Sequence, residues 1–210
     1  NEIEIPRGGE FDLVLADGTQ VWLNAESRLR YPVEFSGKER KVVLEGEAYF
    51  QVKKNPHLPF RVEIRNQVIE VLGTEFNVSG YKDEAQVYTT LVNGKVKVAT
   101  TDRDMTLLPG EQCVLNTGDG SMIRQQVDVD KIISWKKGKF ILEEQTLEQI
   151  MQKLARWYDI TVFYQNPALK DKVFKGSVPR YTELQQVLNI LEKTDEVKFH
   201  IQNRTVMVRE

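Results

Sequence analysis

The chain has 210 residues and a mass of 24.3 kDa, enough for two modest domains, and 40% of its residues are hydrophobic. Its 29 basic and 31 acidic residues nearly balance, which argues against a nucleic-acid-binding surface or a polybasic membrane patch. A single cysteine, Cys113, excludes an intramolecular disulfide and a zinc site built on cysteine pairs.

No run of about eighteen apolar residues is present, so the sequence predicts no membrane span. The chain opens at Asn1 rather than at methionine and shows no signal peptide. We therefore interpret it as either a mature product or an excised piece of a longer protein.

Residues 1–115 show the two-residue alternation of apolar and polar side chains that is typical of half-buried strands. The alternation is clearest in Phe11–Leu15, Phe60–Ile64 and Val96–Val98. Asp17-Gly18 and Asn93-Gly94 separate apolar runs and predict tight hairpins. This part is predicted to be an all-β domain with short strands, sandwich- or solenoid-like.

Residues 116–133 are polar and glycine-containing, and we interpret them as a connector. The pattern then changes to mixed α and β over residues 134–210. Leu147, Ile150, Met151 and Leu154 are spaced as one face of a helix, and Thr146 with Gln149 predicts a capping box at its start.

The same stripe recurs 37 residues later at Leu184, Val187, Leu188 and Leu191, where Thr182 and Gln185 offer a second capping box. Strands are expected at Phe140–Leu142, Ile160–Tyr164, Val173–Ser177, Val197–Ile201 and Thr205–Val208. The order β-α-β-β-α-β-β predicts a small α+β domain of duplicated βαβ units.

The carboxylate pairs Glu45/Glu47 and Glu143-Glu144 are the most visible candidates for acid–base catalysis. Accidental pairs are expected among 31 acidic residues, however, so we assign them no catalytic role. His57 lies in a proline-bounded loop, and His200 should lie on the outer face of its strand. We predict that the protein is not an enzyme, with no catalytic, cofactor-binding or metal-binding residue and no cofactor.

Three further features have a more ordinary structural explanation. Cys113 is expected to be a small buried apolar residue. The basic cluster Lys136, Lys137 and Lys139 is followed by acidic residues and reads as a solvated strand edge. The tryptophans Trp22, Trp135 and Trp157 suggest a sugar-binding platform, but each lies in an apolar context where core packing is expected.

Several strings occur in one order along the chain. They are Asp17–Asn24 (DGTQVWLN) with Ser27 and Tyr31-Pro32, Leu44–Val52 (LEGEAYFQV), Pro59–Val62, Val71–Val78 (VLGTEFNV) with Tyr81, Leu91–Val96, and Leu108–Gln112. The set resembles the periplasmic domain of the FecR family. Each string also has a structural role without the family, because Gly46 and Gly73 suit backbone bends while Phe50, Phe60, Phe76 and Val78 suit a core.

Residues 134–210 resemble the C-terminal domain that accompanies this family in Bacteroidetes. Phe140 and Glu143 with the first helical stripe, then Gly176-Ser177 before the second helix, carry that likeness. The segment also looks like the short N-terminal signalling domain of secretins and TonB-dependent receptors.

The resemblance implies a regulator of an extracytoplasmic-function sigma factor. Family members are single-span inner-membrane proteins that bind the sigma factor through a cytoplasmic segment, which this chain lacks, and receive a signal from a TonB-dependent outer-membrane transporter. The chain is then expected to be the periplasmic sensor, with residues 134–210 docking the transporter's signalling domain through a strand edge. The alternative is a periplasmic carbohydrate- or small-ligand-binding module.

Overall fold

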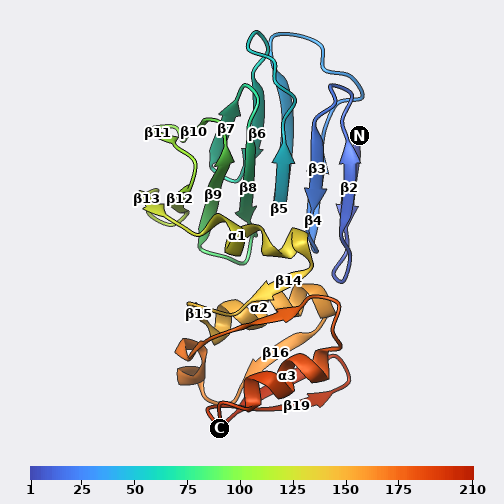
Figure 1. Cartoon of the computed structure of the whole chain (residues 1–210), viewed down its shortest axis with the longest axis vertical. Helices are drawn as coiled ribbons and strands as arrows, with labels where there is room; N and C mark the ends of the chain where they lie inside the picture. Colours follow the sequence, from blue (N-terminus) through green and yellow to red (C-terminus); the bar gives the residue numbers. More distant parts are fainter. The chain divides into compact units, whose positions relative to one another are not determined.

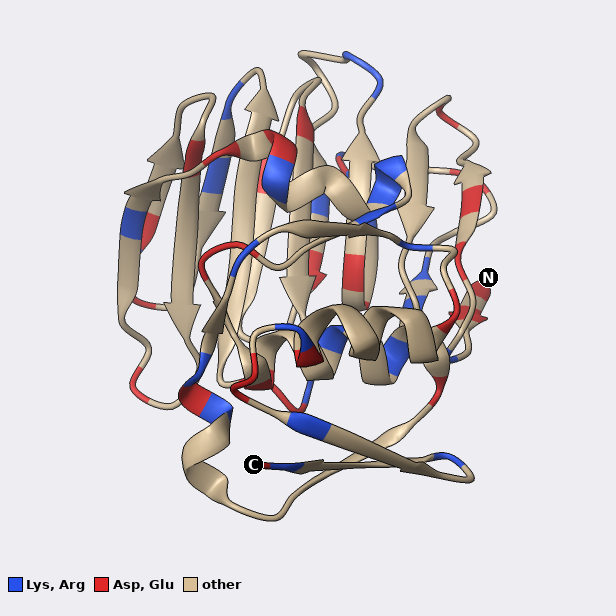
Figure 2. Ribbon diagram, turned by 60° about the horizontal axis from the view of Figure 1, so that its bottom comes forward, with Lys and Arg blue, Asp and Glu red and all other residues tan.

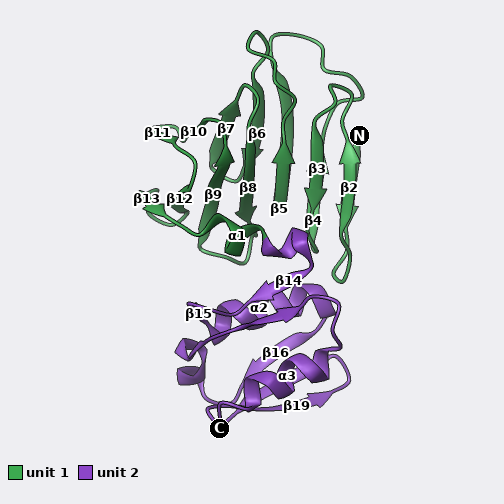
Figure 3. Cartoon of the chain, viewed as in Figure 1, with its two compact units in different colours: residues 1–133 green, residues 134–210 purple.

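A computed structural model describes all residues from 1 to 210 (Figure 1). The chain divides into two compact units, residues 1–133 and residues 134–210 (Figure 3). Strands predominate over helices, and none of the helices is long and apolar enough to cross a membrane. Each unit is described by itself.

The first unit is built from thirteen strands in one hydrogen-bonded sheet. The strands are β1 (Glu2–Ile5), β2 (Phe11–Val14), β3 (Gln20–Leu23), β4 (Ser27–Arg30), β5 (Arg40–Gln51), β6 (Phe60–Ile64), β7 (Gln67–Val71), β8 (Glu75–Gly80), β9 (Gln86–Asn93), β10 (Val96–Ala99), β11 (Asp104–Leu107), β12 (Glu111–Asn116) and β13 (Met122–Gln126). The short helix α1 (Val129–Ile132) follows and lies against β9.

The twelve-residue strand β5 folds this sheet into two leaves, because its two halves pair with different strands. Residues 40–45 lie between β4 and β6, whereas residues 46–51 lie between β3 and β8. The change occurs at Gly46, whose φ of 92° is open to glycine but strained for other residues. A Cβ at Gly46 would also lie only 2.8 Å from the Cα of Ser27.

The leaves enclose one hydrophobic core. The first leaf contains β1, β4, β6, β7, β10 and β11 with the first half of β5, and the second leaf contains β2, β3, β8, β9, β12 and β13 with the other half. Val62 and Val98 of the first leaf and Phe76 and Leu91 of the second are all fully buried in it. The alternation of apolar residues along the strands therefore marks the faces turned toward each other.

Of the two predicted hairpins, one is confirmed and one is wrong. Asp17-Gly18 joins β2 to β3, which pair antiparallel. Asn93-Gly94 instead joins β9, in the second leaf, to β10, in the first. Gly94 passes close to Thr74 there, and the Thr74 hydroxyl donates a hydrogen bond to the Lys95 carbonyl at 2.9 Å. A turn dipeptide fixes the local bend, but not which strands pair.

The second unit contains two longer helices and several short strands. Its elements are β14 (Lys139–Ile141), β15 (Gln145–Thr146), α2 (Leu147–Tyr158), β16 (Thr161–Tyr164), the 3₁₀ helix η2 (Pro167–Asp171), β17 (Val173–Phe174), β18 (Ser177–Pro179), α3 (Leu184–Glu192), β19 (Lys198–Gln202) and β20 (Thr205–Arg209). A further 3₁₀ helix, η1 (Ile133–Lys137), spans the boundary between the units. Residues 116–133, expected to form a connector, also include β13 and α1.

Both predicted helices are present, but only the first has its predicted cap. Thr146 accepts a hydrogen bond from the Gln149 amide, and the Gln149 side chain accepts one from the Thr146 amide, so the capping box is complete. The cap residue of α3 is Glu183, with no side-chain cap hydrogen bond, so the second predicted box at Thr182 is wrong. Both apolar stripes face the core of this unit.

The predicted fold class is wrong. The first unit is neither a solenoid nor a pair of separate sheets, since one continuous sheet folds nearly closed on itself. The second unit is not a duplicated βαβ domain, because a βαβ unit needs its helix to join parallel strands of one sheet. Helix α2 joins β15, which pairs with β17, to β16, which pairs with β20. Helix α3 likewise joins β18 to β19, and these strands belong to different sheets.

Candidate functional site

Polar side chains from three of the ordered strings, Asp17–Asn24, Leu44–Val52 and Val71–Val78, meet on the second leaf. The Glu47 carboxylate on β5 accepts hydrogen bonds from the side-chain amides of Asn24, 2.7 Å away, and Asn77, 3.0 Å away. These two amides come from the end of β3 and from β8, the neighbours of β5 on either side. The carboxylate thus links three adjacent strands of the sheet.

The other carboxylate of that predicted pair has a different environment. Glu45 forms an ion pair with Lys82 at 2.5 Å, and this contact holds the pKa of Glu45 below its usual value. Because Gly46 marks the change of pairing partners along β5, Glu45 lies in the first leaf and Glu47 in the second. The two carboxylates have separate partners and do not form an acid–base pair.

A buried ion pair joins Asp17, the first residue of the Asp17–Asn24 string, to Arg40 on β5. This pair was not predicted from the sequence. Arg40, only 1% exposed, donates from Nη1 to Asp17 Oδ2 at 2.7 Å and to the Lys53 carbonyl at 2.7 Å. Its Nε donates to the Leu58 carbonyl at 2.9 Å. Asp17 also accepts from the hydroxyl and the amide of Thr19. Arg40 lies in the polar run Lys38–Lys41, which resembles an exposed loop and gave no signal of burial.

The remaining nucleophile and base candidates lie apart from one another. Cys113 is fully buried on β12, and burial raises the pKa of its thiol to about 11. His57 lies in a loop where its amide donates to the Asn55 side chain, and His200 is exposed on β19, as predicted. The lysines of the basic cluster lie in η1 and at the start of β14. Glu143 and Glu144 lie between β14 and β15, where Glu144 adopts a φ of 61°.

The tryptophans are packed against other side chains. Trp22 meets Tyr49 edge to face, with ring centroids 5.5 Å apart and an interplanar angle of 70°. In the second unit the guanidinium of Arg180 lies 3.9 Å from the ring centroid of Trp157 and 5.7 Å from that of Trp135. Trp135 is buried and Trp22 and Trp157 are half-buried, so none of the three offers a fully exposed ring for stacking on a sugar.

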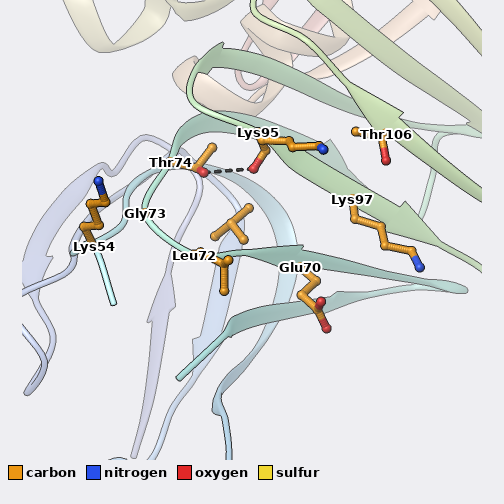
Figure 4. A pocket seen from close by; sticks show the side chains of 9 residues that line it. Lys54, Glu70, Leu72, Gly73, Thr74, Lys95, Lys97 and Thr106 are labelled. Atoms are coloured by element: carbon orange, nitrogen blue, oxygen red, sulfur yellow. Dashed lines mark hydrogen bonds between the residues drawn. The ribbon is translucent and has the colours of Figure 1, made fainter. Parts of the chain in front are cut away.

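One surface groove of the first unit lacks converging polar groups. A groove of about 320 Å³ is lined by Lys54, Glu70, Val71, Leu72, Gly73, Thr74, Lys95, Lys97 and Thr106. Figure 4 shows the three lysine side chains pointing in different directions. Lys97 is paired with Asp104 and Glu70 with Arg61, so part of this charge is already compensated. A specific small-molecule site would need polar groups directed at a common point.

The second unit offers an open strand edge. Its three-stranded sheet has the order β16-β20-β19, with β16 parallel and β19 antiparallel to the central strand. The amides of Thr161 and Gln165 donate to the carbonyls of Arg204 and Val208. Because backbone groups alternate along a strand, the amides of Val162 and Tyr164 point away from β20 toward the open edge.

The two edges of this sheet differ. On β19 the outward amide of Phe199 donates to the Glu192 side chain at 2.6 Å, so the end of α3 caps that position. On β16 no strand covers the outer side. Unpaired backbone groups on an edge strand are a template for pairing with another chain. We therefore take β16 as the candidate docking edge.

Comparisons with known proteins agree on one family. The model described as "FecR protein" matches residues 1–97, and the model described as "FecR, C-terminal" matches residues 139–208, together most of the chain. Two crystal structures of a candidate anti-sigma factor from Parabacteroides distasonis are similar over the whole length. One is 28% identical with a TM-score of 0.93, covering 100% of this chain and 99% of that one. The other is 29% identical with a TM-score of 0.91, covering 100% and 98%.

No curated protein matches the chain. The two family matches leave out residues 98–138, yet the structural similarity extends through them. The ordered strings, the matches to both parts of the family and the full-length likeness to two crystal structures all lead to the same conclusion. The chain belongs to the FecR family of anti-sigma factors.

Proposed function

We propose that this chain is the periplasmic sensor region of a membrane-anchored sigma-factor regulator. In this proposal it receives a signal from a TonB-dependent outer-membrane transporter by docking the transporter's signalling domain. An extracytoplasmic-function sigma factor is bound elsewhere in the regulator, through a cytoplasmic segment. Membership of the FecR family supports the regulatory role, since anti-sigma factors act by binding proteins.

The observation that carries the docking step is the open edge of β16. Its outward amides at Val162 and Tyr164 can accept a partner strand without any rearrangement of the sheet. In the first unit, by contrast, the motif residues Asn24, Glu47 and Asn77 bond to one another within the fold. This contrast favours docking through the second unit.

The test is a proline substitution at an outward amide. Proline at Thr161 would remove a hydrogen bond to β20. The amide of Phe163 also points toward β20, so proline at either position would damage the sheet itself. Val162→Pro removes only an amide that faces the open edge. Val162→Ala is the matched control, because it shortens the same half-buried side chain and keeps the amide.

Binding of the full chain to the signalling domain of the transporter encoded beside it is measured by calorimetry. We expect Val162→Ala to bind nearly as the unmodified chain does, and Val162→Pro to lose at least about tenfold in affinity, or ~1.4 kcal/mol. Thermal unfolding checks that both variants are folded. Equal affinities for the two variants would show that the edge is not used. No binding by the unmodified chain would remove direct docking and favour the ligand-binding alternative.

A further inference from the structure

The outward face of the three-stranded sheet is open and ordered into rows. Side chains alternate along each strand, so those that do not enter the core share the outer face. All of them are exposed: Thr161, Phe163, Lys198, His200, Gln202, Thr205, Met207 and Arg209. The strand register aligns them in a polar row, an apolar row and a basic row.

The central row of this face, called the apolar row, consists of two apolar side chains and His200. Phe163 is opposite Met207, and Met207 is opposite His200, so the three side chains cross the sheet in a line. Phe163 is 57% exposed and Met207 is 36% exposed. Aromatic residues and methionine are enriched in protein interfaces. An exposed row of this composition, rimmed by polar residues, is typical of an interaction surface.

The basic row concentrates charge of one sign. Lys198 lies directly opposite Arg209 in the antiparallel pair, and like charges placed opposite each other destabilise a sheet. Arg209 has no ion pair, and Lys198 has only Asp195, whose nitrogen–oxygen distance is 3.4 Å and whose side chain is 90% exposed. No acidic residue lies on the three strands, and β19 and β20, near the marked C-terminus, carry blue but no red (Figure 2).

From these rows we infer that the outward face binds a folded protein surface that carries carboxylates beside an exposed apolar side chain. The inference rests on the proposed function and specifies its partner: the contacting surface of the transporter's signalling domain is acidic around an apolar centre. The carboxylates of the partner meet Lys198 and Arg209, which relieves their mutual repulsion. The apolar side chain covers Phe163 and Met207.

Charge complementarity of this kind has a measurable signature. Opposite charges on two proteins accelerate their encounter, and salt weakens that effect because the screening length falls below 10 Å near physiological ionic strength. The affinity of the full chain for the signalling domain should therefore fall as sodium chloride rises. The double variant Lys198→Glu/Arg209→Glu should lose both the affinity and most of its salt dependence.

The experiment compares four forms of the full chain by calorimetry at low and moderate salt. They are the unmodified chain, the double charge reversal, Phe163→Ser, and the control Lys175→Glu/Lys193→Glu. The control makes the same change of net charge at exposed lysines outside the sheet, so it isolates position from total charge. We expect a loss of about tenfold or more for the first two variants and less than about threefold for the control.

The possible failures can be told apart. If the unmodified chain does not bind the signalling domain, both the proposed function and this inference fail. If it binds and Val162→Pro abolishes binding while the charge reversal and Phe163→Ser bind normally, docking stands and this inference is wrong. Co-sedimentation of the chain with phosphatidylglycerol vesicles, lost in the charge reversal, would assign the face to a lipid surface and also overturn it.

Discussion

Replacing Arg40 with methionine tests whether the buried ion pair holds the first unit together. Methionine keeps an unbranched apolar stem but removes the guanidinium that donates to Asp17 and to the carbonyls of Lys53 and Leu58. These acceptors would lose a donor that is 1% exposed. Removing one member of a buried pair costs about 3–5 kcal/mol, because the other charge is left without its partner.

The structure places this variant near the lower end of that range. The Asp17 side chain is 13% exposed, so water can partly solvate its carboxylate, and Thr19 continues to donate two hydrogen bonds to it. We therefore expect a loss of about 3 kcal/mol. For a chain of this size, that corresponds to a melting temperature lower by about 6–12 °C.

Urea denaturation and differential scanning calorimetry of the full chain measure the loss. Lys41→Met is the matched control, since it is the next residue on β5 and its ion pair with Glu63 is exposed, so stability should change little. In an Asp17→Ala background the Arg40 substitution should cost at least about 1 kcal/mol less than in the unmodified chain. A change within about 1 kcal/mol of the control, or full additivity in that cycle, would refute the anchoring role.

Two other predictions concern the backbone and the thiol. Gly46→Ala should lower the free energy of unfolding by about 2–4 kcal/mol, because it combines a positive φ with a Cβ 2.8 Å from the Ser27 Cα. The control Gly37→Ala, with φ of 115° and open space around the residue, should lower it by only about 1 kcal/mol. Similar urea midpoints for the two variants would contradict this prediction. Burial raises the pKa of Cys113 to about 11. At pH 8 a thiol reagent should therefore label the folded chain at least about a hundredfold more slowly than the urea-unfolded chain. Equal labelling rates would show that the thiol is accessible in the folded chain.

The elements that sequence analysis predicted correctly are those fixed by neighbouring residues. The capping box at Thr146 and Gln149 depends on four consecutive residues, and the Asp17-Gly18 turn joins two adjacent strands. The expectation that Phe50, Phe60 and Phe76 belong to a core is confirmed too, since all three are fully buried. In each case the information lies within a few positions of the chain.

The errors share the opposite property, since they depend on residues far apart in sequence. Asn93-Gly94 has the chemistry of a hairpin turn, but β9 had already found its partners in β8 and β12. A repeated helical stripe suggested βαβ units, but the pairing of β14 with β18 and of β16 with β20 decides the topology. Periodicity reports which side of an element is buried, not which strand lies beside it.

The candidate site shows the same division. Sequence analysis placed His200 on the outer face of its strand, because alternation with Phe199 and Ile201 is a local signal. It did not find the row of Phe163, Met207 and His200, since the parallel register of β16 with β20 cannot be read from either strand alone. It also missed Arg40, whose partners lie from thirteen to twenty-three positions away.

The polar side chains of the sequence motifs and those of the open sheet differ in what they contact, and this difference bears on which residues can distinguish one protein partner from another. Asn24, Glu47 and Asn77 use hydrogen bonds on one another, so their contribution is to hold β3, β5 and β8 in register. A side chain whose polar groups are already used in such internal hydrogen bonds cannot distinguish one partner from another through them.

Discrimination between partners has to come from residues whose polar groups and apolar surface remain exposed. On the sheet of the second unit those are Phe163, Met207 and the opposed cations of β19 and β20, none of which belongs to a recurring string. If the proposed docking holds, partner specificity is carried by residues other than those that carry the family resemblance.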